Sequence, residues 1–429
     1  MNKEKLIDMH YNLFFMYSDQ YIEKQYLKFL SDKIKIIKEV LFYFIRPFGH
    51  LYRFFLNPSI LNNKNKNNVF FVCHTQNNYF SIKGILDHLN NNYSIVKTDY
   101  SLDFDGQYIP KFIPGFLSFI FIPKYFQILF KSNKKEKKIL LFSFDTILYS
   151  MGYHYYFNWY IKNYKPKTII YSNDHIFQTR AIVRCAEKYS IKCIYLQHAS
   201  VTNIFPPLIS SFSLLEGEDA KNKYLENESG SSGIHLIGMP KFDKYVNKTN
   251  SYQMVKSIGI CTTYAMKKNT VIKLLEFIVN NFPNIKLYLR PHPAEISKYV
   301  NYDNIQNVTI SNSIMENSFK FLNKVDAIIT GNSSILLEAA LVNVYPIYYF
   351  SEPRTKWKDD LYDKYGYIKN KIAIEIKNEN QLFDYLNLIT NQNPNISINT
   401  KYYCDTVGTK WQGRSSELAS KYINQFISN

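Results

Sequence analysis

Cysteine is scarce in this chain of 429 residues, and its spacing matches no ligand or disulfide pattern. The five cysteines are odd in number, are scattered from Cys73 to Cys404, and include no pair separated by two residues. Disulfide frameworks and zinc sites depend on regular spacing of this kind. We therefore expect a protein of the reducing cytosol, without a disulfide or zinc framework.

An unbroken apolar run and a secretion signal are also missing. The first residues, Met1 to Asn12, contain no short apolar core with a small-residue cleavage site, so we expect no signal peptide. Residues 112–130 are apolar and almost reach the ~20 residues that a bilayer span needs. Interruptions in this run and the lysines after it favour a monotopic membrane anchor, as does the basic-aromatic segment 34–56. The alternative is a buried helix beside a solvated run of charge.

Acidic residues are outnumbered, with 35 Asp and Glu against 52 Lys and Arg, which gives a net charge of +17. Such a balance predicts an anionic partner. The chain has no recognisable nucleic-acid module, no zinc-knuckle spacing and no Arg-rich run, so we expect no nucleic-acid partner. An anionic membrane surface and a phosphorylated substrate remain as the expected partners.

The abundance of hydrophobic and aromatic residues and the order of the apolar runs indicate a folded protein of two domains. Hydrophobic residues make up 46% of the chain and aromatic residues 17%, which excludes a disordered chain. Short apolar strands alternate with helices of roughly ten to twenty residues, the pattern of parallel sheets with right-handed crossovers. We expect strands of the first series at 69–74, 94–98, 139–144, 168–171, 193–196, 214–217 and 236–243. We expect strands of the second series at 258–262, 285–289, 308–310, 327–330 and 344–349, with helices near 266–281, 314–323 and 333–342.

The predicted fold class is therefore α/β, with two Rossmann-like β/α/β domains that face a central cleft. An N-terminal helical segment, residues 1–65, is expected to associate with a membrane. The first domain covers 66–250 and carries a basic-aromatic insertion at 112–138, and the second covers 251–410. In residues 411–429 we expect a closing helix, and the sequence leaves open whether this helix crosses back to the first domain.

Two polar turns at predicted strand ends carry the strongest functional signal. The first is Arg290-Pro291-His292-Pro293 and the second is Gly331-Asn332-Ser333-Ser334, which opens into a helix. In an open parallel sheet such strand ends line the ligand crevice. His292 offers a ring nitrogen to a phosphate or a base, while Gly331–Ser334 offers hydroxyls and free backbone N–H groups. The sequence thus predicts a pocket for a nucleotide diphosphate or a nucleotide sugar.

Each of these residues also has a plainer interpretation. Flanking prolines fix the backbone around His292, which is also what a rigid turn with an exposed histidine requires. Asn332 or Ser333 would serve equally as an ordinary helix N-cap. Glu338, one turn after Ser334, either accepts hydrogen bonds from ribose hydroxyls or compensates the helix dipole.

Candidate catalytic residues follow two strands of the first domain. His198 lies at the end of strand 193–196, where a neutral imidazole can take a proton from an attacking hydroxyl. Asp174 and His175 follow strand 168–171 and are the rival pair, unless they only cap the helix that begins at Ile176. The Asp-x-Asp spelling at 103–105 is short enough to arise by chance, and we predict no metal site and no other cofactor.

Four short stretches carry a family resemblance: residues 290–293, residues 331–334, Leu-Gln-His-Ala at 196–199 and Gly-Met-Pro-Lys-Phe-Asp at 238–243. They resemble the two-domain GT-B transferases. Within these, the chain is most similar to the group of CDP-glycerol glycerophosphotransferases and bacterial capsule sialyl-, polysialyl- and Kdo-type transferases. The resemblance spans roughly residues 69–410 and implies a first domain for the acceptor and a second for the nucleotide donor.

The resemblance also implies roles for single residues. It implies that His292 contacts the phosphate or the cytidine of the donor, with Arg290 in the same turn, and that Ser333 and Ser334 hold the donor phosphate. His198 matches a histidine that serves the acceptor, although Ala199 stands where the family has glycine. Asp105-Gly106 matches only half of the acidic pair that sialyl-type members use as a base, since Phe104 occupies the other position.

The function expected from all of this is metal-independent glycosyl or glycerol phosphate transfer in bacterial surface polysaccharide synthesis. The donor would be cytidine-activated, carrying a sialic-acid-type or Kdo-type sugar or glycerol phosphate, and the acceptor a glycan or lipid-linked glycan hydroxyl. The enzyme would be cytoplasmic and peripheral on the inner face of the cell membrane. Alternatives are a UDP-sugar enzyme of the same fold, including a 2-epimerase, and a non-enzymatic scaffold that binds glycan or lipid.

Overall fold

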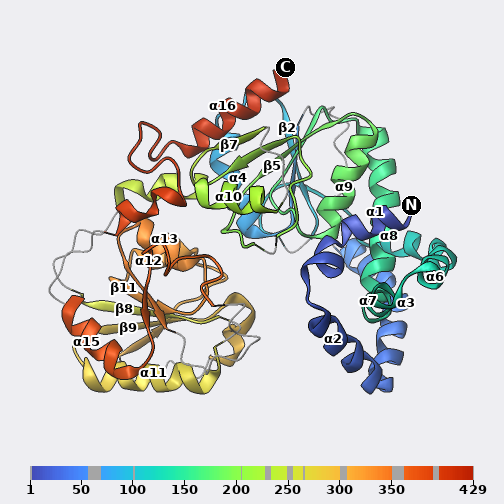
Figure 1. Cartoon of the computed structure of the whole chain (residues 1–429). Coiled ribbons are helices and arrows are strands. Elements are labelled where there is room, and N and C mark those ends of the chain that lie inside the picture. The colour runs from blue at the N-terminus through green and yellow to red at the C-terminus, as the bar shows by residue number, and fades with distance from the viewer. Residues whose placement is uncertain are drawn as a thin grey trace.

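The computed structural model of the chain describes residues 2–56, 69–99, 102–203, 205–227, 233–248, 255–263, 266–299, 307–349, 362–389 and 396–428. Two parallel sheets form separate lobes, with the helices of the chain arranged around them (Figure 1). The linker at 61–68 and parts of several loops, including 228–232, lie outside the described residues.

The N-terminal sheet has seven strands in the order β3-β2-β1-β4-β5-β6-β7, and its strand pairs are parallel. Its central strands are buried on both faces, which is why they read as continuous apolar runs rather than alternating ones. The strands are β1 Val69–Cys73, β2 Tyr93–Lys97, β3 Gln107–Tyr108, β4 Thr168–Tyr171, β5 Lys192–Leu196, β6 Phe212–Leu215 and β7 Ile234–Leu236. The predicted strand at 236–243 is wrong, because it shares only Leu236 with β7 and a 3-10 segment, η2 (Pro240–Lys248), follows.

The C-terminal sheet has six parallel strands in the order β10-β9-β8-β11-β12-β13. The strands are β8 Ser257–Cys261, β9 Lys286–Arg290, β10 Val308–Ile310, β11 Ala327–Thr330, β12 Tyr345–Tyr349 and β13 Ile374–Ile376. The strand order reverses between β8 and β11, which is the arrangement of a doubly wound sheet. The predicted α/β class with two Rossmann-like domains is confirmed.

Helices cover both sheets. In the N-terminal domain they are α4 Gln76–Leu86, α8 Phe144–Tyr164, α9 Phe177–Lys188 and α10 Glu218–Glu226. In the C-terminal domain they are α11 Lys268–Asn281, α12 Ser318–Leu322, α13 Ile335–Leu341 and α15 Glu379–Ile389, with the 3-10 segments η3 Pro293–Lys298 and η5 Ser397–Tyr402.

The last helix, α16 (Ser415–Ser428), packs on the N-terminal domain although it follows the C-terminal one (Figure 1). Its residues Leu418 and Ile423 share a core with Val69 of β1. The helix starts on the carboxylate of Asp243, which accepts hydrogen bonds from the backbone N–H of Ser415 and of Ser416 at 2.9 and 2.7 Å. The chain end therefore ties the two domains together.

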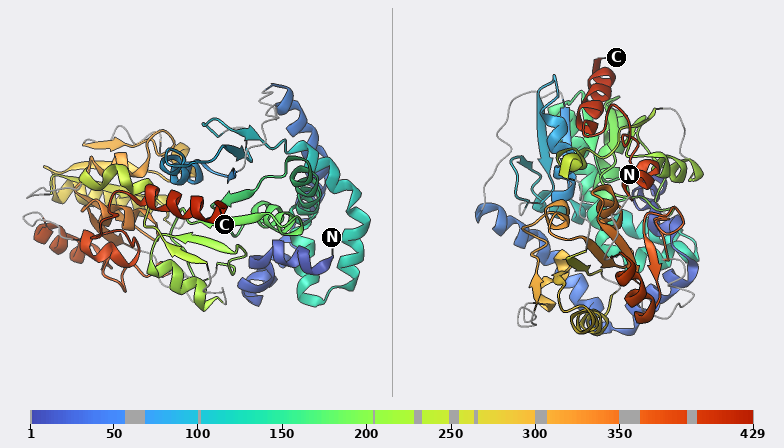
Figure 2. Two further views of the ribbon diagram at one scale, coloured as in Figure 1. Left: turned by 90° about the horizontal axis from the view of Figure 1, so that it is seen from above. Right: turned by 90° about the vertical axis from the view of Figure 1, so that its left-hand side faces the viewer.

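The first helices lie at the end of the molecule opposite the C-terminal domain (Figures 1 and 2). They are α1 Lys3–Met9, a π-helical turn η1 Asn12–Met16, α2 Asp19–Ser31 and α3 Lys33–Leu56. α3 packs against α5 (Phe112–Ile120), where a Cβ on Gly115 would come within 2.9 Å of the Pro47 ring. α5 in turn packs tightly on α8.

The predicted strand at 139–144 is wrong, because these residues are helical. α7 (Lys134–Phe142) begins with a capping box in which Asn133 and Glu136 bond reciprocally, and α8 starts at Phe144. Tertiary burial of Ile139 and Leu140 against the helical layer outweighs the strand-like composition of this run. Within the described residues no single helix has the length and apolarity to cross a membrane, but α5 and α6 (Ile122–Lys131) pass that test together, with a 60° bend between them.

Candidate active site

Two neighbours of β8 in the C-terminal sheet lead into predicted donor residues, and β8 itself leads into Thr262, which was not predicted. Thr262 follows β8, His292 follows β9 and Gly331 follows β11, and β8 lies between the other two strands. The His292 N–H donates to Thr262 Oγ1 at 2.9 Å, which fixes one turn to the next. This is the point where the strand order reverses, the usual ligand site of an open α/β sheet.

The His292 ring is set to act as a donor. The backbone N–H of Ala294 donates to His292 Nδ1 at 3.3 Å, so the neutral ring carries its proton on Nε2. Burial lowers the pKa of His292, which keeps the ring neutral at pH 7. An N–H of this kind can meet a phosphate oxygen or a base carbonyl.

The loop from Gly331 to Ser334 leads into α13, and its serines do little capping. Ser334 is the N-cap residue in helical backbone geometry, and its side chain makes no cap hydrogen bond. Ser333 Oγ accepts from the Ile335 N–H only at 3.5 Å, the outer limit for such a bond. The hydroxyls are therefore little used in capping, and their role toward a ligand stays a prediction.

Arg290 points to a different part of the domain. Its guanidinium is 5.0 Å from the centre of the Phe321 ring and donates to Ser311 Oγ at 2.9 Å and to the Glu316 carbonyl at 2.7 Å. The residue is buried, at 8% exposure. In this arrangement Arg290 braces the 290–293 turn from behind.

At the N-terminal sheet, His198 follows β5 and has the properties of a general base. Its Nδ1 atom is buried and has no hydrogen-bond partner in the part of the chain that the structure describes. Burial lowers the pKa of His198 to about 4, and the charge of Lys241 acts in the same direction. The ring is therefore neutral at pH 7 and able to accept a proton.

A second histidine, His74, lies beside it and was not among the predicted site residues. Its Nδ1 is 2.9 Å from Thr98 Oγ1 and its Nε2 is 2.7 Å from Thr179 Oγ1, so both ring nitrogens are occupied. Burial lowers the pKa of His74 to about 3, with further contributions from the nearby His198 and His175. The ends of β1, β4 and β5 thus bring three histidines together, and His74 lies at the end of a predicted strand where polar ends could have drawn notice.

Asp174 is buried, whereas the neighbouring His175 is partly exposed. Asp174 is 1% exposed, and its Oδ2 accepts from the Tyr224 hydroxyl at 2.5 Å. Its Oδ1 lies 3.3 Å from Nδ1 of His175, whose side chain is one-third exposed. Neither residue caps the following helix, since the N-cap of α9 is Ile176 without a side-chain bond. Asp174 therefore orients His175 from within the fold.

A buried ion pair connects the two sets of strand ends. Lys241 Nζ lies 2.7 Å from Glu338 Oε1 on α13 and donates to the His198 carbonyl at 3.4 Å. Glu216 completes the cluster: burial raises its pKa to about 7, Lys241 lowers it and Glu338 raises it. Burial lowers and the two carboxylates raise the pKa of Lys241, with a net upward shift. Glu338 thus contacts Lys241, in addition to the two roles considered for it above.

Some of the buried polar atoms that have no partner among the described residues lie at or near these strand ends. Beside His198 Nδ1, they include Asn173 Oδ1, Thr202 Oγ1 and Thr263 Oγ1 among the described residues. Buried polar groups in native proteins nearly always have a hydrogen-bond partner. A polar ligand bound at these strand ends can supply hydrogen-bond partners for them.

The Asp-x-Asp stretch at 103–105 is held by contacts of its central residue, Phe104. The Phe104 ring stacks on Tyr79 with 4.3 Å between ring centroids, and Lys97 Nζ donates to the Phe104 carbonyl at 3.0 Å. In the described ranges no group of three or more His, Cys, Asp or Glu side chains is arranged to hold a metal ion.

Lys241, Glu216 and His74 are the residues that sequence reasoning missed. Lys241 lies within the 238–243 stretch that carries the family resemblance, but its partner Glu338 is 97 positions away. Glu216 acquires its raised pKa only from tertiary burial. Pattern reasoning has no access to contacts of this range.

No protein-family model and no curated protein sequence matches the chain. Several solved structures, however, are similar to the chain in fold. The wall teichoic acid polymerase TagF is 13% identical with a TM-score of 0.52 over 94% of this chain and 98% of that one. A TagF variant soaked with CDPG is 12% identical, with a TM-score of 0.53 over 92% and 98%. The UDP-GlcNAc 2-epimerase of Methanocaldococcus jannaschii, in complex with UDP-GlcNAc and UDP, is 14% identical with a TM-score of 0.51 over 83% and 99%. These likenesses establish that the chain has the two-domain GT-B-like fold.

Proposed function

We propose that this protein is a membrane-peripheral transferase of bacterial surface polysaccharide synthesis that uses a cytidine-nucleotide-activated donor. The acceptor is a hydroxyl of a glycan or lipid-linked glycan, and the transferred group is a sialic-acid-type or Kdo-type sugar or glycerol phosphate. The observation that carries the proposal is the pairing of two polar strand ends, one with a neutral His198 and one with His292 and the 331–334 loop, joined by Lys241.

The proposed chemistry assigns a separate task to each strand end. The acceptor oxygen forms a bond to the transferred group, the bond from that group to CMP breaks, and His198 receives the acceptor proton. Negative charge grows on the departing phosphate. His292 and the serine hydroxyls of the 331–334 loop are placed to stabilise that charge by hydrogen bonds.

The membrane part of the proposal is supported by α3. Only Tyr43 and Pro47 of this 24-residue helix are buried. An apolar stripe faces outward, each side chain at least 54% exposed and spaced by three or four residues: Ile34, Ile37, Leu41, Ile45, Phe48, Tyr52 and Phe55. Exposed apolar surface of this extent marks an interaction site.

Basic residues near the apolar stripe indicate which kind of surface it binds. Exposed Lys33, Lys35, Lys38 and Arg53 lie on the same helix, and α6 adds exposed Phe126 and Phe130 beside Lys131. Basic residues flanking an apolar helix face favour the headgroups of anionic lipids. We therefore place α3 in the plane of an anionic lipid surface on the cytoplasmic side.

A UDP-sugar enzyme, including a 2-epimerase, is the second candidate. It is favoured by the likeness to the M. jannaschii 2-epimerase in complex with UDP-GlcNAc and UDP. The likeness to TagF covers 94% of this chain against 83% for the epimerase, which is why the transferase is preferred. The third candidate function is a non-enzymatic scaffold that binds glycan.

Nucleotide release tests the reaction. The full chain is incubated with an oligosaccharide acceptor and, in turn, CMP-sialic acid, CMP-Kdo, CDP-glycerol or UDP-GlcNAc, and free nucleotide is measured by chromatography. Acceptor-dependent release of CMP is expected. Release of UDP, or a change in the UDP-sugar without release, would replace the proposal by the second candidate. Absence of any reaction with glycan binding retained would indicate the scaffold.

Vesicle sedimentation tests the membrane part. Replacing Ile45, Phe48 and Phe55 by serine is expected to abolish binding to vesicles that contain phosphatidylglycerol. The control replaces Phe383, Leu388 and Ile398, exposed apolar residues of the C-terminal half, by serine and is expected to bind normally. If instead the α3 variant binds vesicles unchanged but turns a dimer into a monomer, the stripe is a contact between two copies of the chain.

A further inference from the structure

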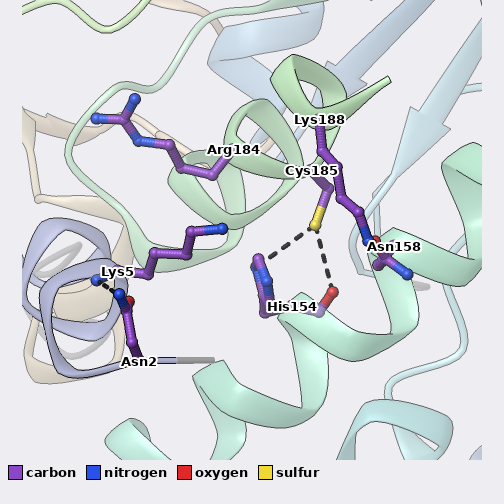
Figure 3. Close-up of a pocket in the computed structure, with 7 residues that line it drawn as sticks. All are labelled: Asn2, Lys5, His154, Asn158, Arg184, Cys185 and Lys188. Carbon is purple, nitrogen blue, oxygen red and sulfur yellow. Dashed lines mark hydrogen bonds between the residues drawn. The ribbon is translucent and has the colours of Figure 1, made fainter. Parts of the chain in front are cut away.

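A cavity of about 380 Å³ lies among α1, α8 and α9, formed by residues that have no part in the strand-end site. Figure 3 shows its lining, which includes Lys5 of α1, His154 of α8, and Arg184 and Lys188 of α9. Ligand pockets in proteins usually range over ~300–1,000 Å³, so this cavity suits a small ligand.

The lining carries an excess of positive charge. Arg184 is neutralised locally, with its Nε 2.7 Å from Asp8 Oδ2 and its NH1 2.9 Å from Glu187 Oε1. The same Asp8 also pairs with Arg180 at 2.8 Å. In the described part of the chain, Lys5 and Lys188 pair with no carboxylate. Lys188 Nζ donates to Asn158 Oδ1 at 3.1 Å and lies 5.5 Å from the centre of the Tyr189 ring. Two ammonium groups therefore remain for an anion.

The floor of the cavity offers a third nitrogen. The Cys185 thiol donates to the His154 carbonyl at 3.3 Å, and Cys185 Sγ is also 3.4 Å from His154 Nδ1. Because the thiol donates its proton to the carbonyl, Sγ can only accept from the ring, which places the proton of the neutral ring on Nδ1. No hydrogen bond of Nε2 is present among the described residues. Burial lowers the pKa of His154 to about 4, so Nε2 carries no proton at pH 7 and can accept a hydrogen bond from a protonated phosphate oxygen.

We propose that this pocket binds a phosphate group, supplied either by a soluble phosphorylated compound or by a phospholipid headgroup. Lys5 and Lys188 would donate charge-assisted hydrogen bonds to its oxygens, and the neutral His154 ring would accept at Nε2 from a protonated phosphate oxygen. The amide of Asn158 in the lining is a further donor, while the Asn2 amide already donates to Glu4 Oε2 at 3.3 Å. The site is independent of the proposed transferase activity.

Isothermal titration calorimetry of the full chain with pyrophosphate tests the soluble source. The titration is done in a His292→Ala background, so that binding at the 331–334 loop does not contribute. Lys5→Gln with Lys188→Gln is expected to weaken pyrophosphate binding by about tenfold or more, since hydrogen bonds to charged groups contribute ~1.5–3 kcal/mol each. Lys162→Gln, an exposed lysine of α8 outside the cavity, is the matched control and is expected to bind as the background does.

Vesicles of phosphatidylcholine with and without phosphatidic acid test the lipid source with the same variants. A preference for phosphatidic acid that the double variant loses and Lys162→Gln keeps would assign the site to a headgroup. Either form of pocket-dependent binding should raise the pKa of His154 in histidine NMR spectra. The proposal is overturned if neither ligand binds, or if the double variant binds both as tightly as Lys162→Gln does.

Discussion

Beyond β1, β4 and β5 of the N-terminal sheet lie three histidines and the buried Asp174, and burial lowers the pKa of His74 and His198. Beyond β8, β9 and β11 of the C-terminal sheet lie hydroxyls, backbone N–H groups and a single histidine. Both sheets are parallel and order their strands in the same doubly wound way. The topology therefore supplies the location of a site in each half, while the side chains decide its chemistry.

The comparison separates proton transfer from anion binding. A neutral imidazole with a partnerless nitrogen can accept a proton, which a serine hydroxyl at pH 7 cannot. A loop of hydroxyls and N–H groups can surround a phosphate without itself changing charge. Lys241 contacts both halves, which in the proposed function would hold the two groups at a fixed separation.

The largest effect is expected from His198→Ala. Removing the general base should lower the turnover of CMP release by about 10²–10⁴-fold, the usual contribution of such a group. Nucleotide binding, measured separately, should stay within about twofold of the unaltered protein. His88→Ala, a histidine outside the strand-end cluster, is the control. Full turnover in His198→Ala would move the base to His175.

Lys241→Met tests the connection between the two halves. The substitution leaves Glu338 buried without its cation, which should lower the free energy of unfolding by about 3–5 kcal/mol. Urea denaturation measures this loss. Lys244→Met, on the exposed side of η2, should change stability by less than about 0.5 kcal/mol. Adding Glu338→Gln to Lys241→Met should recover part of the loss, and no recovery would mean that the pair is not coupled.

Glu216→Gln tests the pH dependence of the same cluster. Burial raises the pKa of Glu216 from 4.5 to about 7, so between these values the folded protein holds a proton that the unfolded chain has released. The contribution of Glu216 to stability therefore falls as pH rises through this window. At pH 8 the Gln variant should be more stable by up to ~3 kcal/mol, and near pH 4 the difference should vanish. Glu218→Gln is the control, and an equal difference at both pH values would contradict the assignment.

Ser334→Ala should have the smallest effect. If the hydroxyl bonds a donor phosphate, its removal should raise the Kd for CMP by about two- to tenfold, because one hydrogen bond contributes ~0.5–1.5 kcal/mol. Calorimetric titration with CMP measures it. An unchanged Kd would place the phosphate on the backbone N–H groups of the loop alone.

The strands of both sheets could be read from sequence because buried parallel strands are continuous apolar runs between polar turns. The run at 139–144 has the same composition, yet it is helical because the capping box at 133–136 starts a helix before it. The edge strand β3 has two residues, too few to show a pattern, and β13 is Ile-Glu-Ile, which is not a continuous apolar run.

The site is partly predictable for the same reason. His198 and His292 follow recognisable strands, so their place at a carboxyl edge can be inferred from local pattern. The brace from Arg290 to Ser311, and the ion pair of Glu338, depend on partners that only the folded chain brings near. Residues that act through such contacts become visible only with the structure.

The measurement that tests the division of tasks most directly is the thermal shift of the purified protein with CMP, CDP and UDP. A nucleotide that binds only the folded state raises the melting temperature by mass action. We predict a shift with CMP or CDP that disappears in His292→Ala and persists in His198→Ala. A shift that disappears in His198→Ala and persists in His292→Ala would contradict the account.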